Sequence, residues 1–151
     1  MLEKDIQNNI ISFLKEIGFD PVFAVQNGAT FDPTRKIFRK PGKHREAGIS
    51  DIIGLLPNGK GFAIEVKSRK GRPTEEQLKF ITRWNSSLGV AFISRSVWQT
   101  YSQLLSFWPQ IQHFEDIALA YKQKEEVSSA LAEQGKGIVK GRIKRSKELQ
   151  N

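Results

Sequence analysis

Ile49-Ser-Asp-Ile-Ile-Gly-Leu-Leu56 and Gly61-Phe-Ala-Ile-Glu-Val-Lys67 are the two stretches that decide the fold of this 151-residue chain. Both are rich in β-branched and other apolar residues, and only Pro57-Asn-Gly-Lys60 separates them, so they predict a β-hairpin. The first two residues of this linker suit the central positions of a type I turn, and its glycine suits the left-handed position that follows. The turn sets which residues face each other across the hairpin.

The predicted register places two acidic residues opposite each other. It pairs Asp51 with Glu65, with their Cβ atoms about 5 Å apart on one face of the sheet. Lys67 follows Glu65 by two residues and therefore lies on the same face. A two-residue Asn-Gly loop would instead pair Asp51 with Val66 and separate the acids, so the prediction of a shared site depends on the turn.

Two facing carboxylates and a lysine indicate a metal site with hydrolytic chemistry. The carboxylates repel each other unless a cation lies between them, and oxygen ligands without sulfur or imidazole favour Mg²⁺ or Mn²⁺. A bound metal acidifies a water and neutralises charge on a phosphoryl oxygen, and the Lys67 ammonium can stabilise the same charge. We therefore predict phosphodiester hydrolysis by Asp51, Glu65 and Lys67.

A solvated strand is the alternative explanation of Glu65 and Lys67, because Glu-x-Lys alternation is also typical of a strand with one wet face. The neighbours on that face argue against it. Ala63 on the same strand and Ile53 opposite indicate a covered face, on which a pair of carboxylates needs compensation.

The overall composition suits a polyanionic partner. The chain carries 24 Lys and Arg against 16 Asp and Glu, a net charge of +8, which favours nucleic acid, although an anionic membrane surface exerts the same attraction. Six basic residues crowd one segment and are predicted to bind DNA phosphates: Arg35, Lys36, Arg39, Lys40, Lys43 and Arg45. The lack of cysteine excludes disulfides and thiolate metal sites, and two histidines leave little basis for a zinc site.

The remaining segments predict helices around a mixed sheet. Helical patterns occupy residues 2–17, 73–85, 96–107 and 114–133. Strand patterns occupy residues 22–26 and 90–93, whereas residues 30–47 lack either period and are expected to form a mobile loop. We expect an α/β fold with a mixed central sheet flanked by helices in a nuclease domain of residues 1–134, followed by a mobile basic tail, 135–151.

Two further polar residues could lie near the predicted site. Gln77 belongs to the first turns of the helix after the hairpin, where it could hydrogen-bond a water or a phosphate, or equally be an exposed helix residue. Glu3 lies on the apolar face of the first helix, so it either points toward the sheet or belongs to a frayed terminus. The apolar face of the helix that carries Gln77 is predicted from Leu78, Ile81 and Trp84.

These motifs together resemble the VRR-NUC branch of the PD-(D/E)XK nucleases. The resemblance covers residues 2–93 and rests on Gly48-Ile-Ser-Asp51, Ile64-Glu-Val-Lys67 and Gly71-Arg-Pro-Thr-Glu-Glu-Gln77. It implies a restriction-endonuclease-like fold and hydrolysis of DNA with Mg²⁺ or Mn²⁺. By this match the metal ligands are Asp51 and Glu65, and the catalytic residues are Lys67, Gln77 and Glu3. Ser50 stands where the family has the Pro of its name, a position that supplies backbone shape and not a ligand.

Two alternatives to a DNA-cutting enzyme stay open at the level of the sequence. The chain could keep the nuclease fold and the basic surface as a DNA-binding or accessory protein without catalysis, although its complete set of site residues argues against this. It could also act on RNA, because the same metal site attacks either backbone.

The resemblance also suggests a homodimer that cuts branched DNA in the manner of a Holliday-junction resolvase, because a two-fold axis would supply a second active site. The apolar residues that could form the interface, or pack in the core instead, are Trp98, Leu104, Leu105, Phe107 and Trp108. The sequence has no long apolar run and no leader pattern, so we expect a cytoplasmic, nucleoid-associated protein of bacterial or phage origin.

Overall fold

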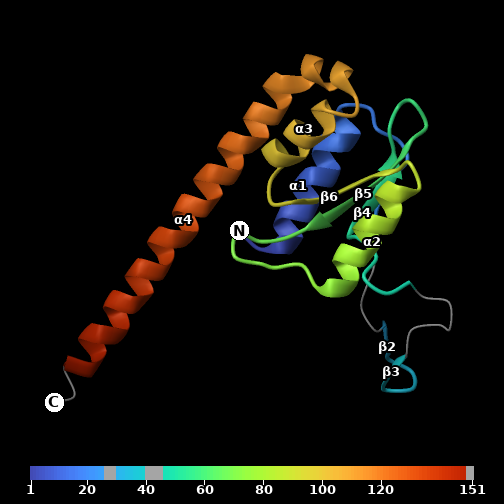
Figure 1. The fold of residues 1–151 in the computed structure, drawn as a ribbon. Coiled ribbons are helices and arrows are strands. Elements are labelled where there is room, and N and C mark those ends of the chain that lie inside the picture. Colours follow the sequence, from blue (N-terminus) through green and yellow to red (C-terminus); the bar gives the residue numbers. More distant parts are fainter. Residues whose placement is uncertain (26–29, 40–45, 149–151) are drawn as a thin grey trace.

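The fold is a four-stranded sheet with helices on both faces, together with a separate two-stranded hairpin (Figure 1). The structure is a computed structural model that describes residues 1–25, 30–39 and 46–148, with the backbone alone described for residues 30–32, 38–39 and 136–148. The α/β class and the mixed sheet predicted from the sequence are confirmed. Among the helices of the described ranges, none combines the length and the apolar character needed to cross a bilayer.

The sheet has the strand order β1 (Val22–Ala24), β4 (Ile52–Leu55), β5 (Gly61–Val66) and β6 (Val90–Ser94). β4 runs antiparallel to both β1 and β5, whereas β6 is parallel to β5. The carboxyl ends of β5 and β6 therefore lie at the same edge of the sheet. This edge carries the end of β5 and the residues that follow it.

The hairpin of β4 and β5 has the predicted register. Leu55 pairs with Gly61, and the Leu56 N–H donates to the Lys60 carbonyl at 2.8 Å. Gly59 has a φ of +83°, as a left-handed turn position requires. The ladder ends with Ile52 paired to Ile64, so the next residue on each strand brings Asp51 level with Glu65.

Helices cover the two faces of the sheet differently. α1 (Glu3–Glu16) and α3 (Val97–Leu105) build the main core on one face, where Ile10, Phe13 and Leu104 are fully buried. α2 (Glu75–Ser86) lies on the other face and packs against Ala63 and Ala91 in a smaller cluster. Side chains of β5 alternate between the two faces, so Glu65 shares the α2 side with Ala63.

The face of α2 that packs on the sheet differs from the prediction. Phe80 is the buried residue of this helix, with Ile81 and Trp84 packed beside it, whereas Leu78 is 46% exposed. The Phe80 and Trp84 rings lie 5.5 Å apart. Successive helix positions turn by about 100°, so a face centred on residues 80 and 84 turns residue 78 to solvent.

The segment predicted as a loop over residues 30–47 contains a hairpin. β2 (Thr30–Asp32) pairs antiparallel with β3 (Ile37–Arg39), and Lys36 takes a φ of 53° in the turn between them. The turn residues that follow Asp32, with a proline among them, hid the two short strands from a search for strand periodicity.

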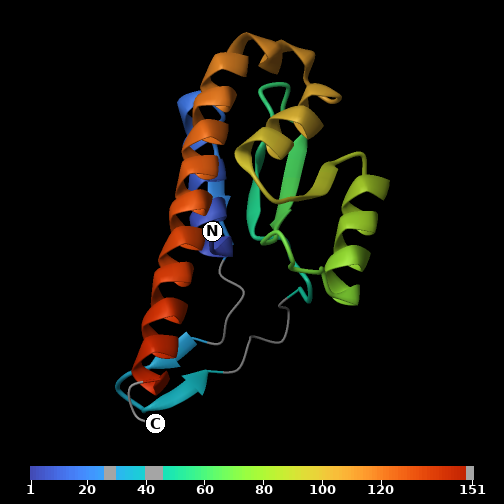
Figure 2. The same cartoon turned by 90° about the vertical axis from the view of Figure 1, so that its left-hand side faces the viewer.

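The last helix is longer than predicted. A short 3₁₀ turn, η1 (Pro109–Phe114), leads into α4 (Glu115–Glu148), which continues past the expected end at residue 133. Figures 1 and 2 show α4 leaving the body of the molecule along its second half. Its first half is docked: Glu125 is buried and accepts from the Val97 N–H at 3.2 Å. The mobility of the tail stays a prediction.

Candidate active site

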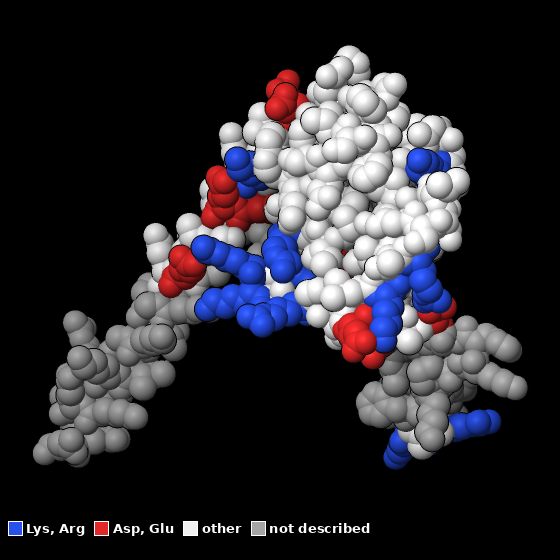
Figure 3. Space-filling model, in the orientation of Figure 1, with Lys and Arg blue, Asp and Glu red and all other residues white. Residues whose placement is uncertain are grey.

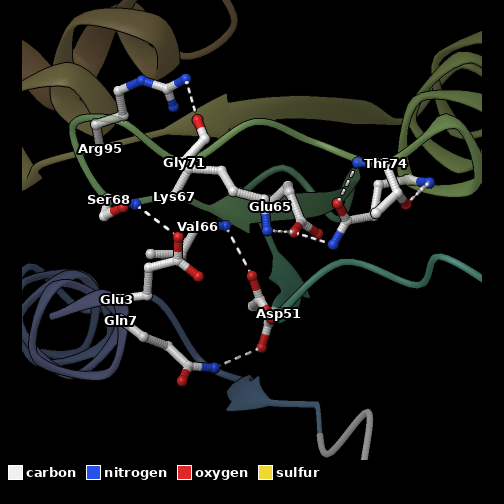
Figure 4. A network of polar contacts seen from close by, with 11 residues as sticks. Glu3, Gln7, Asp51, Glu65, Val66, Lys67, Ser68, Gly71, Thr74 and Arg95 are labelled. Atoms are coloured by element: carbon white, nitrogen blue, oxygen red, sulfur yellow. Dashed lines mark hydrogen bonds and ion pairs between the residues drawn. The ribbon is translucent and has the colours of Figure 1, made fainter.

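Three charged side chains meet at the carboxyl end of β5 (Figure 4). Glu65 is the penultimate residue of the strand and is fully buried. Lys67 follows the strand, and its side chain is 11% exposed. Asp51, just before β4, reaches across to the same place, because its carboxylate accepts from the Val66 N–H at 2.8 Å. The structure therefore brings together the two acids and the lysine that the sequence singled out.

Glu65 is the most strongly perturbed group of this site. Its Oε1 atom lies 2.6 Å from the Lys67 ammonium and also accepts from the Gln77 amide. Burial is the main cause that raises the pKa of Glu65 from 4.5 to about 7; the negative charge of Asp51 adds to the rise, and Lys67 opposes it. Two carboxylates held this close resist ionising together unless a cation compensates them.

Asp51 is positioned by both of its polar groups. Its carbonyl accepts from the Gln7 amide of α1 at 2.9 Å and from the Val25 N–H at 2.8 Å. Its carboxylate is fixed by the Val66 N–H, as described above. The neighbouring Ser50 is fully buried, and its hydroxyl has no partner within the described part of the chain. The backbone of Asp51 is thus held by α1 and by the residue after β1, and its carboxylate is directed by β5.

Gln77 has two roles at the start of α2. Its Oε1 atom accepts from the Thr74 N–H at 2.8 Å, and its own N–H donates to the Thr74 hydroxyl at 3.3 Å, which forms a capping box. The cap turns the amide nitrogen toward Glu65. The segment Pro73–Gln77 therefore positions an amide donor on the buried carboxylate. Gln77 is thus not the plain exposed helix residue that the sequence left open.

Gly48 fixes the distance between α2 and the segment that carries Asp51. It has a φ of +69°, and a Cβ atom here would overlap the Glu76 carbonyl and lie 2.6 Å from the Gln77 nitrogen. No other residue fits this close approach without moving the helix. The sequence motif contained this glycine, but only the structure shows that it lies against the backbone of Gln77.

Glu3 lies beside the site, and its hydrogen bond within the described residues goes to the backbone that follows β5. It is exposed, at the first residue of α1, and its Oε1 atom accepts from the Ser68 N–H at 2.9 Å. Its described polar contact is therefore to the residue after Lys67. This geometry suits a residue that holds the chain following β5.

The predicted DNA-binding residues fall mostly outside what the structure describes. Lys40, Lys43 and Arg45 lie outside the described residues, as does the side chain of Arg39. Arg35 and Lys36 are exposed in the turn between β2 and β3, away from the site. Their role in binding stays a prediction.

A group of cations near the site was missed by the sequence analysis. Arg69, Lys70 and Arg72 follow Lys67 directly, in the connection from β5 to α2, and all three are exposed. Figure 3 shows Lys and Arg side chains gathered on the underside of the body, where Figure 1 places this connection. The signal was present as the basic run Ser-Arg-Lys-Gly-Arg, but the larger clusters elsewhere in the chain obscured it.

The carboxylates at this site have the character of hard-metal ligands. Glu65 Oε2 is a buried oxygen with no hydrogen-bond partner within the described residues, and such an atom calls for a cation or a proton. The donor set is oxygen alone, as Mg²⁺ and Mn²⁺ prefer. The described residues contain no cluster of three or more His, Cys, Asp or Glu side chains, so an ion here would take two carboxylates and complete its shell with water and substrate oxygens.

Comparison with known proteins supports the fold. The backbone is similar to that of a solved structure named "VRR_NUC domain protein", with a TM-score of 0.53 and 17% sequence identity. The match covers 72% of this chain and 89% of that chain. No protein-family model matches the chain, and no curated protein matches it. At this level of identity the likeness shows a shared fold, and the chemistry must be argued from the site itself.

Proposed function

We propose that the chain is a metal-dependent nuclease of the PD-(D/E)XK type that hydrolyses DNA phosphodiester bonds. The observation that carries this proposal is the buried Glu65 carboxylate, which faces Asp51, is paired with Lys67 and has one oxygen with no hydrogen-bond partner among the described residues. The fold shared with a VRR_NUC domain protein and the net charge of +8 point in the same direction.

Asp51 and Glu65 would hold Mg²⁺ or Mn²⁺, which when bound supplies an acidified water and neutralises charge on the phosphoryl group. Lys67 would donate to the attacking water or to a phosphate oxygen, and its place beside Glu65 keeps this ammonium at the reacting centre. Gln77 would hold the Glu65 carboxylate in a single orientation through its amide donor. Each of these groups is fixed before substrate binds, which is what electrostatic stabilisation of a transition state requires.

The proposal is tested by incubating the purified chain with end-labelled duplex, single-stranded and branched DNA and with RNA, each in Mg²⁺, Mn²⁺ or EDTA. We expect cleavage of DNA in either metal and none in EDTA. Binding of DNA without cleavage in any metal would favour the alternative of a nuclease-fold DNA-binding protein. Cleavage of RNA but not of DNA would support the proposed metal site and would make RNA, not DNA, the substrate.

A preference for branched DNA and a symmetric dimer form the narrower part of the proposal. Among the apolar residues considered for the interface, Leu104 is buried and the two tryptophans pack against the core. Leu105 and Phe107 are 36% and 46% exposed, at the end of α3 and just beyond it. These two residues would be the anchors of a two-fold contact.

A further inference from the structure

The connection from β5 to α2 carries three exposed cations. Arg69, Lys70 and Arg72 are exposed, and in the described part of the chain no carboxylate pairs with any of them. Exposed cations elsewhere can be paired, as Lys79 is with Glu75 at 2.6 Å. Three like charges within four residues repel one another, so an anion that bridges them would be bound favourably.

The backbone of this connection is held in place from both sides. Glu3 accepts from the Ser68 N–H at 2.9 Å, and the Gly71 N–H donates to the Ser68 carbonyl at 3.1 Å. On the other side the Arg95 guanidinium donates to the Gly71 carbonyl at 3.0 Å. Figure 4 shows Glu3 and Arg95 approaching the chain from opposite sides. The backbone of the loop is thus fixed, whereas its basic side chains are exposed.

Gly71 makes this arrangement compact. A Cβ atom at this position would lie 2.6 Å from Glu3 Oε1 and 3.0 Å from the Ser68 hydroxyl, so a larger residue would push the Glu3 carboxylate away. The close approach lets a single carboxylate organise the turn. The hydrogen bond between Glu3 and Ser68 is therefore a specific contact of α1 with the loop.

Arg95 adds a fixed positive charge behind the loop. Arg95 follows β6, at the same edge of the sheet as Lys67. Its backbone N–H donates to the Gln99 side-chain oxygen at 2.8 Å. One of its guanidinium nitrogens, Nη1, is buried and has no partner within the described residues. No described carboxylate neutralises this cation, so it adds to the positive potential at the edge where the site lies.

We propose that Ser68–Arg72 is a phosphate clamp, a preorganised loop that grips the nucleic acid backbone next to the scissile bond, with Glu3 and Arg95 as positioning residues. The inference rests on the proposed function, because the clamp places the strand beside Lys67. It changes the role of Glu3, which the family resemblance assigned to catalysis, to holding the loop. The clamp would bind the phosphodiester backbone of the nucleic acid and would not read its base sequence.

The first test compares two charge-matched double variants in EDTA, where binding is measured without cleavage. Arg69→Gln/Lys70→Gln removes two clamp cations, whereas Lys15→Gln/Lys60→Gln removes two exposed cations at the far ends of α1 and of the β4–β5 hairpin. Binding of fluorescent duplex DNA is titrated at several salt concentrations. The clamp variant should bind about tenfold more weakly or worse at low salt, and its log-log salt slope should flatten by about 1.8, or 0.9 for each contact.

The control variant should keep a salt slope within about 0.5 of the wild-type value, because its cations touch no phosphate. Equal slopes for the clamp and control variants would overturn the clamp, as would a wild-type chain that does not bind DNA. Strong, clamp-dependent binding by a chain that never cleaves would support the clamp and refute the proposed nuclease. The two claims therefore fail in distinguishable ways.

The second test concerns the positioning role of Glu3. Glu3→Gln keeps an oxygen that can accept from Ser68, whereas Glu3→Ala removes the acceptor. We expect Glu3→Gln to bind DNA and to cleave it within a few-fold of wild type, and Glu3→Ala to weaken binding to the extent of the clamp variant. A large loss of cleavage in Glu3→Gln with unchanged binding would instead make Glu3 a catalytic carboxylate and overturn its positioning role.

Discussion

Replacing the buried carboxyl of Glu65 by an amide of the same shape should change how the stability of the chain depends on pH. The ordinary pKa of a glutamate is 4.5, and burial raises that of Glu65 to about 7 in the folded chain. The difference of about 2.5 corresponds to a free energy of about 3 kcal/mol for ionising this group inside the fold. Such a value is a large fraction of the stability of a small domain.

The direction of this pH dependence follows from the raised pKa of Glu65. Below about pH 4.5 Glu65 is protonated in both the folded and the unfolded chain, and the folded chain carries no cost. As the pH rises from about 4.5 to about 7, the unfolded chain releases this proton into water while the folded chain keeps it, so stability is lost across this range and levels off once the buried carboxyl also ionises. Glu65→Gln lacks this ionisation, so the stability of wild type relative to Glu65→Gln should fall by about 3 kcal/mol between about pH 4.5 and pH 8.

The assay is urea unfolding of both proteins at pH 4.5 and pH 8 in EDTA, with the exposed Glu126→Gln as a control that keeps the wild-type dependence. Mg²⁺ should then restore stability to wild type at pH 8 and not to Glu65→Gln, because it binds the ionised carboxylate. A concentration ten times the dissociation constant adds about 1.4 kcal/mol. A difference between wild type and Glu65→Gln that is the same at both pH values would show that Glu65 does not ionise at a raised pKa in the fold. Equal stabilisation of both by Mg²⁺ would show that the metal does not bind this carboxylate.

Three further outcomes follow from the same structure. Gly48→Ala should destabilise the chain by at least about 2 kcal/mol in urea unfolding, because its Cβ would overlap the α2 backbone at a positive φ; Gly18→Ala, which meets no atom within 4 Å, should cost less. If the chain is a dimer in light scattering, Phe107→Asp should convert it to a monomer and slow junction cleavage more than duplex cleavage; a dimer unchanged by this variant rules out that face. Reversal to Glu of Lys40, Lys43 and Arg45 should weaken DNA binding and flatten its salt slope by at least about 2.7, and an unchanged slope excludes that segment as a docking surface.

The approach of Asp51, Glu65 and Lys67 to one another could be predicted because a single turn determines it. Once Gly59 takes the left-handed position, the pairing of Leu55 with Gly61 is fixed, and so is the approach of Asp51 to Glu65. Side-chain alternation then places Lys67 on the same face without any long-range information. These steps use local rules alone, which is why the sequence sufficed.

The other features of the site could not be predicted from the sequence, because they depend on contacts between distant segments of the chain. The contact of Glu3 with Ser68 joins residues 65 positions apart, and the contact of Arg95 with Gly71 joins residues 24 apart. Neither pair shares a pattern that a sequence displays. The exposed Leu78 has a similar cause, because the phase of α2 is decided by how Phe80 fits against the sheet and not by the apolar residues of the helix alone.

The most direct measurement is the rate at which Glu65→Gln cleaves labelled duplex DNA in saturating Mn²⁺, compared with wild type and with the exposed control Lys60→Ala. We expect Lys60→Ala to cut at the wild-type rate. Glu65→Gln and Lys67→Ala should each lose at least about a hundredfold in rate, because each lacks one strong electrostatic contribution to the reaction. All variants should bind DNA in EDTA. Cleavage by Glu65→Gln at the wild-type rate would contradict the central claim that this carboxylate, with Asp51 and Lys67, forms the active site.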